Sequence, residues 1–207
     1  MVAVAAYLLG SIPTGFLVAK AKGMDIRKTG SGNIGATNAM RVLGKPAGIL
    51  VLLADAAKGY AAVFVLPLVG VNLFDATHTT DAELFRSCVI AGICAVLGHN
   101  YTCWLKFKGG KGIATTAGVY LALAPWALLV ALTVFILAIL LTKYVSVGSI
   151  AAAIALPVTV WIMTPQNIFL GIVTTALGAL AIYKHKPNIQ RLMAGTENRL
   201  GQKKETK

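Results

Sequence analysis

The longest uncharged stretch of the chain places the strongest constraint on its fold. Ile113–Thr142 is a run of 30 residues without Lys, Arg, Asp or Glu, and Pro125 interrupts it. A transmembrane helix needs about 20 apolar residues to cross about 30 Å of hydrocarbon. The stretch is too long for one ordinary span and short for two, so length alone leaves one helix or two open. We predict a helical hairpin with spans over 113–124 and 126–142 that turns at Pro125, because this arrangement places the basic segments on one side of the membrane.

Further segments have the apolarity of membrane spans, and they cover residues 2–19, 48–66, 84–98, 145–163 and 168–183. The chain of 207 residues is 57% hydrophobic and 13% charged, which is far from the composition of a soluble domain. No basic region or cleavage pattern marks the first segment as a signal peptide, so we expect a retained span. We therefore predict an all-α, polytopic membrane helical bundle with seven transmembrane helices in a single domain over 1–207.

The basic residues predict the orientation of this bundle. With seven spans, all 19 Lys and Arg residues except Lys58 and Arg86 fall on one side of the membrane. The opposite loop carries Asp75, Asp81 and Glu83. The positive-inside rule assigns the basic side to the cytoplasm. We predict a multi-pass membrane protein, with its N-terminus outside and its C-terminus in the cytoplasm. The net charge of +12 then needs no nucleic-acid partner.

Three polar segments lie on the predicted cytoplasmic side. Gly30–Arg41 (GSGNIGATNAMR) combines glycines, which permit close backbone approach, with neutral donors and an arginine, and is either an anion site or an ordinary loop. Gly98–Gly112 (GHNYTCWLKFKGGKG) places lysines and glycine amides before a helix, as a phosphate site or a stop-transfer cluster would. Tyr183–Arg199 (YKHKPNIQRLMAGTENR) follows the last span and is either a polar site or an amphipathic anchor.

The few acidic residues limit the chemistry. Asp55 and Lys58 lie three positions apart within a predicted span and can pair along a helix, in either a structural or a catalytic role. On the predicted cytoplasmic side, the sequence contains only Asp25, Glu197 and Glu205. These carboxylates are too scattered for a two-metal site, so we expect neither a metal ion nor a cofactor.

In their order and spacing, the three polar segments resemble the bacterial acyl-phosphate glycerol-3-phosphate acyltransferase family. The resemblance implies transfer of a fatty acyl group from acyl phosphate to the 1-hydroxyl of glycerol 3-phosphate, which gives lysophosphatidic acid and phosphate in phospholipid biosynthesis. Both substrates and membrane lipid are then the expected partners, and the soluble enzyme that produces acyl phosphate is a further candidate. A membrane transporter for organic phosphates is the alternative function.

The resemblance also implies which residues act. The candidate catalytic residues are Ser31, Asn33, Arg41, Lys108 and His185. The candidate substrate-binding residues are Gly32, Thr37, Asn38, His99, Asn100, Gly109, Gly110, Lys111, Gly112, Ser146, Asn188, Glu197 and Arg199. Lys108, Lys111 and the amides of Gly109–Gly112 would hold a phosphate group. The general base stays open between His185, His99 and a substrate phosphate.

Overall fold

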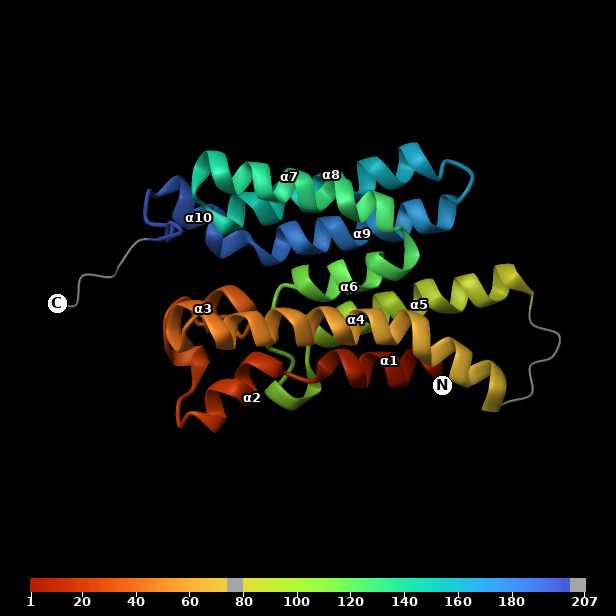
Figure 1. The fold of residues 1–207 in the computed structure, drawn as a ribbon, viewed down its shortest axis with the longest axis horizontal. Coiled ribbons are helices and arrows are strands. Elements are labelled where there is room, and N and C mark those ends of the chain that lie inside the picture. Colours follow the sequence, from red (N-terminus) through yellow and green to blue (C-terminus); the bar gives the residue numbers. More distant parts are fainter. Residues whose placement is uncertain (74–79, 202–207) are drawn as a thin grey trace. The chain divides into compact units, whose positions relative to one another are not determined.

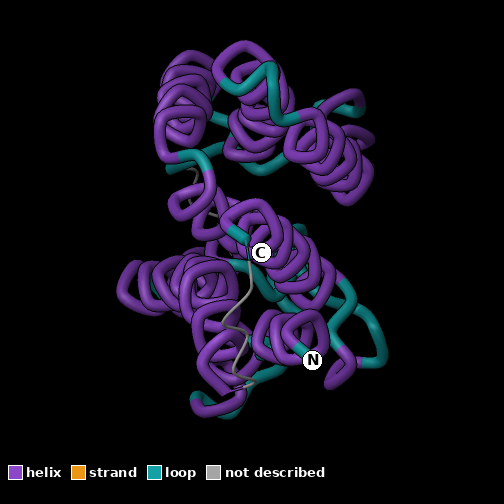
Figure 2. The backbone as a smooth tube through the Cα atoms, turned by 90° about the vertical axis from the view of Figure 1, so that its right-hand side faces the viewer, coloured by secondary structure: helices purple, strands orange, loops and turns teal. Residues whose placement is uncertain are grey.

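A computed structural model describes residues 1–73 and 80–201, and the regular elements in these ranges are helical (Figures 1 and 2). The all-α prediction is confirmed. The chain forms two compact units, Met1–Pro125 and Trp126–Lys207, and each is described by itself. The prediction of a single domain over 1–207 stays a prediction. Asp75, in the predicted outer loop, lies outside the described residues.

The first unit is built around one long helix. Its helices are α1 (Val2–Ser11), α2 (Thr14–Ala21), α3 (Ala36–Leu43), α4 (Lys45–Leu73), α5 (Asp81–Asn100) and α6 (Ile113–Leu123). Two single-turn helices, η1 (Ile26–Lys28) and η2 (Cys103–Leu105), lie in the connections. Helix α1 packs against α4 and α5, while α4 also packs against α3 and α6 (Figure 1).

Glycines let the helices of the first unit approach closely. A methyl group added at Gly10 on α1 would overlap the carbonyl oxygen of Ala95 on α5. A methyl group at Gly118 on α6 would likewise overlap the carbonyl oxygen of Ala56 on α4. Helices in lipid associate mainly through such close packing, because lipid chains are as apolar as the side chains. The short polar segments are therefore held on a tightly packed frame.

The first predicted span is present, but it consists of two helices rather than one. Helix α1 ends at Ser11 and α2 begins at Thr14, with Pro13 between them. Proline has no backbone N–H and its ring crowds the preceding turn, so Pro13 removes one bond of the helix ladder and favours the break. Side chains from α4 and the segment after α5 bond to the backbone at the break: Lys58 Nζ donates to the Ile12 carbonyl (2.8 Å) and Thr102 Oγ1 to the Ser11 carbonyl (2.6 Å).

The second unit contains α7 (Pro125–Thr142), α8 (Val145–Met163), α9 (Ile168–Lys184) and α10 (Lys186–Met193). Helix α8 packs against α9, and Gly178 makes this contact close because an added methyl group would lie 2.6 Å from the Ala153 carbonyl oxygen. Helices α9 and α10 form a bent pair with an angle of 51°. Because α7 begins at Pro125, the predicted interruption of the long uncharged stretch is confirmed.

The number of spans is lower than predicted when judged by length. Within the described residues, five segments are long and apolar enough to cross a membrane, or six if α9 and α10 form one span. Helix α6 has 11 residues, or about 16 Å at 1.5 Å per residue, about half of the hydrocarbon thickness. The structure confirms a helical protein with several membrane spans, while the count of seven and the orientation stay predictions.

Candidate functional site

Asn38 holds the first polar segment in shape from inside the fold. Its side chain is buried at the start of α3, and its Nδ2 group donates to the carbonyl oxygens of Ile26, Thr29 and Asn33 at 3.3, 3.1 and 2.8 Å. Its Oδ1 atom accepts the backbone N–H of Ser31 at 2.9 Å. These hydrogen bonds join Asn38 to the loop backbone, so its observed role is to organise the loop.

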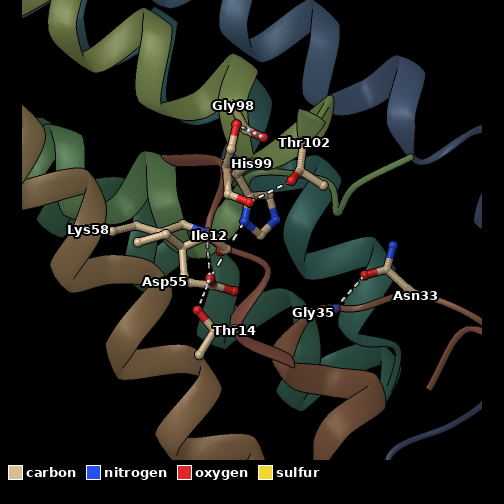
Figure 3. A network of polar contacts seen from close by, with 10 residues as sticks. Ile12, Thr14, Asn33, Gly35, Asp55, Lys58, Gly98, His99 and Thr102 are labelled. Atoms are coloured by element: carbon tan, nitrogen blue, oxygen red, sulfur yellow. Dashed lines mark hydrogen bonds and ion pairs between the residues drawn. The ribbon is translucent and has the colours of Figure 1, made fainter. Parts of the chain in front are cut away.

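The opposite face of this loop is exposed. Gly30 and Gly32 have positive φ angles of 62° and 73°, which let the chain turn tightly around the Asn38 side chain. Ser31, Thr37 and Arg41 are exposed, whereas Asn33 is half-buried and accepts the Gly35 N–H through Oδ1 at 2.8 Å (Figure 3). The predicted loop residues thus divide into an inner scaffold and an outer polar face with hydroxyl and guanidinium donors.

The loop that follows α5 is held in an unusual backbone conformation. Lys106 and Phe107 are consecutive non-glycine residues with positive φ, 53° and 59°. The Phe107 N–H donates to the Thr102 carbonyl oxygen at 2.9 Å, and Lys108 donates to that of Leu105 at 3.1 Å. Thr102 is fully buried. Strained backbone of this kind persists only where the surroundings enforce it and is common at functional sites.

Gly109–Gly112, the glycine loop, is packed directly on the end of α5. The N–H groups of Gly109 and Gly110 donate to the carbonyl oxygens of Asn100 (3.2 Å) and His99 (3.0 Å). A methyl group at Gly110 would overlap His99 Nε2. Gly112 has a φ of +83° and directly precedes α6. The loop therefore lies at a helix N-terminus, where backbone N–H groups and the helix dipole favour an anion.

Three ionisable residues meet behind the glycine loop (Figure 3). Lys58 Nζ and His99 Nδ1 lie 2.9 and 3.6 Å from the same carboxylate oxygen of Asp55. Thr14 Oγ1 donates to that oxygen at 3.2 Å. The predicted pairing of Asp55 with Lys58 is confirmed. The participation of His99 was missed, because it belongs to another helix and the sequence contains no spacing that links it to α4.

In the second unit, the segment after α10 folds back onto polar side chains. Glu197 accepts Asn188 Nδ2 and Arg191 Nε through its two carboxylate oxygens, both at 2.7 Å. His185 lies between α9 and α10, is buried, and has Nδ1 2.7 Å from the Ala181 carbonyl oxygen. With Nδ1 as the donor, a neutral ring carries its lone pair on Nε2. His185, Asn188 and Glu197 thus belong to one structured turn.

The same segment also reaches the start of α8. Arg199 Nε donates to Tyr144 Oη at 2.9 Å, and its guanidinium lies 5.3 Å from the centre of that ring. The Leu200 N–H donates to the Lys143 carbonyl oxygen at 2.8 Å. Ser146 is buried near this point, in the first turn of α8. The predicted residues of this unit are therefore gathered around Glu197 and the first turn of α8.

Replacing Glu197 with glutamine is expected to weaken this turn and to change its response to acid. Burial raises the pKa of Glu197, but hydrogen bonds from Asn188 and Arg191 outweigh it, so the pKa lies below the ordinary 4.5. A lowered pKa means that the carboxylate stabilises the fold above pH 4.5 and that this contribution is lost as the pH falls through the folded-state pKa.

The measurement for Glu197→Gln is thermal unfolding in detergent between pH 3 and 7. We expect a lower Tm at pH 7 and a smaller loss of Tm on acidification than in the unchanged protein. The matched control is Asp81→Asn, which removes an exposed carboxylate at the start of α5, in the other unit. Equal Tm values for Glu197→Gln and the unchanged protein across this pH range would contradict the assigned role.

Comparison with known proteins decides the family. The family model for glycerol-3-phosphate acyltransferase matches residues 1–195. The chain belongs to the glycerol-3-phosphate acyltransferase family. It is 44% identical to the glycerol-3-phosphate acyltransferase of Geotalea daltonii, over 94% of both chains. It is 46% identical to that of Geobacter sulfurreducens, over 94% of this chain and 93% of that protein.

This chain is also similar to solved structures of this acyltransferase family. The crystal structure of PlsY, an integral membrane glycerol 3-phosphate acyltransferase, in its glycerol 3-phosphate form matches with a TM-score of 0.83 and 39% identity, over 97% of this chain and 94% of that chain. Its lysophosphatidic acid form matches with a TM-score of 0.79. The three polar segments therefore lie in a chain that shares the fold of an integral membrane acyltransferase.

Proposed function

We propose that this enzyme transfers a fatty acyl group from acyl phosphate to the 1-hydroxyl of glycerol 3-phosphate, giving lysophosphatidic acid and inorganic phosphate. The observation that carries the proposal is the family match over residues 1–195, together with the likeness to PlsY in its glycerol 3-phosphate and lysophosphatidic acid forms. The donor assignment has separate support, because the first unit contains two segments suited to anions, the exposed face of Gly30–Arg41 and the glycine loop.

The proposed roles follow the chemistry of each segment. Lys108, Lys111 and the end of the glycine loop next to α6 hold one phosphate group through charge and backbone donors. The N–H groups of Gly109 and Gly110 were predicted to join them, but they bond to carbonyl oxygens at the end of α5. Ser31, Asn33 and Arg41 hold the acyl phosphate and stabilise the oxyanion that forms at its carbonyl carbon. Because acyl phosphate is a mixed anhydride and already activated, no covalent enzyme nucleophile is required, and orientation supplies much of the acceleration.

The remaining predicted residues contribute binding and support. His185, Asn188 and Ser146 contact glycerol 3-phosphate, and Glu197 and Arg199 hold the turn that carries them. Gly32, Thr37, His99 and Asn100 complete the loops around the phosphates. The hydroxyl proton passes to a substrate phosphate, whose second pKa is near 6 and which would be held beside the reacting hydroxyl.

The donor is tested with purified protein in detergent that contains EDTA. Palmitoyl phosphate and glycerol 3-phosphate are expected to give lysophosphatidic acid, while palmitoyl-CoA in place of the acyl phosphate gives none. Product from palmitoyl-CoA alone would overturn the donor assignment. The broken first span is a feature found in transporters, so uptake of glycerol 3-phosphate into proteoliposomes without product from either donor would favour the transporter function instead.

Replacing His185 with alanine tests which group is the base. If a substrate phosphate accepts the proton, His185→Ala raises the KM for glycerol 3-phosphate about 10-fold or more and leaves kcat within about threefold. General-base catalysis contributes about 10²- to 10⁴-fold. A fall of kcat by about 100-fold or more would therefore identify His185 as the base. Lys186→Ala, which changes the exposed next residue, is the matched control.

We also propose that the chain lies in the cytoplasmic membrane of a bacterium with seven spanning segments, an external N-terminus and a cytoplasmic active site. Support comes from the placement of the basic residues described above. In a background without the three native cysteines, Thr80→Cys is expected to react with an impermeant thiol reagent in intact cells. Gln190→Cys is expected to react only after permeabilisation, and the reverse pattern would invert the orientation.

A further inference from the structure

Asp55, Lys58 and His99 form a buried ionisable cluster, and the proposed mechanism gives no role to Asp55 or Lys58. Their exposed fractions are 2%, 6% and 5%. Removing charged groups from water is costly, and their mutual attraction offsets that cost only when the geometry is good. Ionisable residues within membrane segments usually have a functional role. The position of this cluster directly behind the glycine loop indicates which role it has.

His99 connects the cluster to the glycine loop. On one side, its Nδ1 atom lies 3.6 Å from Asp55 Oδ1, the distance of an electrostatic contact rather than a short hydrogen bond. On the other side, its Nε2 atom occupies the space that a side chain on Gly110 would need. The His99 carbonyl oxygen also accepts the Gly110 N–H at 3.0 Å. Ring and backbone of His99 thus fix the same residue of the loop.

Lys58 has a different set of contacts. Its Nζ atom neutralises Asp55 at 2.9 Å and donates to the Ile12 carbonyl oxygen at 2.8 Å, in the break between α1 and α2. Neither of these two contacts of Lys58 involves the glycine loop. Of the two charged residues, Asp55 is the one with a direct contact to His99. The two roles can therefore be separated by mutation.

We propose that Asp55 is a positioning residue for phosphate binding, which acts by holding the His99 ring against Gly110. The inference rests on the proposed function of the glycine loop. An attraction between the carboxylate and Nδ1–H selects one ring orientation and tautomer, as carboxylate partners of functional histidines commonly do. The ring then sets the distance between α5 and the loop, and thereby the direction of the loop amides at the start of α6.

The central variant is Asp55→Asn/Lys58→Gln, which removes both charges and leaves no unpaired buried ion. We expect a lower Tm, because the Ile12 carbonyl oxygen loses its Lys58 donor. We also expect an approximately 10-fold or larger rise in KM for a phosphate-bearing substrate and similarly weaker inhibition by inorganic phosphate, neither of which the loss of that bond alone would cause. In metal sites, loss of the carboxylate that orients a ligating histidine typically costs about 10- to 100-fold, and we expect an effect of similar size here. The kcat is expected to stay within about threefold. The control is Thr14→Val, which removes a hydrogen bond to the same carboxylate without touching His99.

Two outcomes with this variant overturn the inference. Unchanged KM and unchanged phosphate inhibition would make Asp55 only the counter-charge of Lys58. A fall in kcat with unchanged KM would place it outside phosphate binding. If the double variant does not fold, Asp55→Glu tests the positioning role of Asp55 instead, because it keeps the charge and moves the carboxylate by one methylene. The same rise in KM is expected there, and a KM equal to that of the unchanged protein refutes the proposal.

Direct binding separates this inference from the proposed function. Radiolabelled glycerol 3-phosphate and inorganic phosphate are bound to the detergent-solubilised protein in the absence of an acyl donor. If the unchanged protein binds phosphate but forms no lysophosphatidic acid, the proposed reaction fails while the role of Asp55 is still decided by the binding of the variants. Equal phosphate affinity of the unchanged protein and Asp55→Asn/Lys58→Gln would reject the role of Asp55 alone.

Discussion

Gly110→Ala is expected to lower kcat/KM for acyl transfer by about 100-fold or more, because a displacement of about 1 Å in a positioning element can cost 10²-fold. The added methyl group would overlap His99 Nε2. The His99 ring has little room to move away from the added methyl group, because Asp55 lies on its other side, 3.6 Å from Nδ1. The loop must move instead, and the bond from the Gly110 N–H to the His99 carbonyl oxygen, now 3.0 Å, must lengthen.

The measurement for Gly110→Ala is a full kinetic analysis with both substrates, alongside a thermal unfolding curve. Gly23→Ala is the matched control, because it introduces the same methyl group at an exposed turn with nothing within 4 Å. Gly23 has a φ of +75°, so this control carries backbone strain that Gly110→Ala does not. If Gly110→Ala retains more than about a third of the activity, the close packing of loop and ring is not required for catalysis.

Asn38→Ala is expected to lower both stability and activity, by several degrees in Tm and by about 100-fold in kcat/KM. It removes the donors to three carbonyl oxygens and the acceptor of the Ser31 N–H. Each buried polar group left without a partner costs about 1–3 kcal/mol. The exposed donors of the loop, Ser31 and Arg41, would then lose their fixed placement even though neither is changed.

Asn38→Asp separates the two halves of this interaction. Aspartate keeps an acceptor for Ser31 but turns a carboxylate toward carbonyl oxygens, so we expect it to be as impaired as alanine. Met40→Ala, which changes an exposed side chain of the same helix, serves as the control for altering α3. Activity of Asn38→Asp near that of the unchanged protein would show that only the bond to Ser31 matters.

The sequence predicted the helices well where apolarity alone decides them. The bounds of α8 match the predicted 145–163, and the start of α7 at Pro125 follows from the chemistry of proline. The division of the first span was not predicted, although Pro13 is visible in the sequence. Hydropathy counts apolar side chains, whereas the break depends on backbone carbonyls that bond to Lys58 and Thr102, and that pairing exists only after folding.

The candidate site, too, could be predicted from the sequence only where its residues lie on one element. The spacing of Asp55 and Lys58 reveals a pair because both lie on one helix. No local spacing reveals His99, which reaches them from another helix. For Asn38, the residue type suits a substrate ligand and a loop organiser equally, and only burial and hydrogen bonds distinguish the two. Residue chemistry thus predicts which segments are polar, while the direction of each side chain requires the fold.

The break in the first span also implies an order of events during synthesis of the enzyme. Lys58 and Thr102, which bond to the carbonyl oxygens at the break, lie 46 and 91 residues away along the chain from the residues that they reach. Because α4 and α5 follow the first segment along the chain, neither partner lies beside it when it enters the membrane, and an unsatisfied carbonyl in hydrocarbon costs several kcal/mol. The bent form of this segment is therefore completed only after α4 and α5 have been inserted beside it.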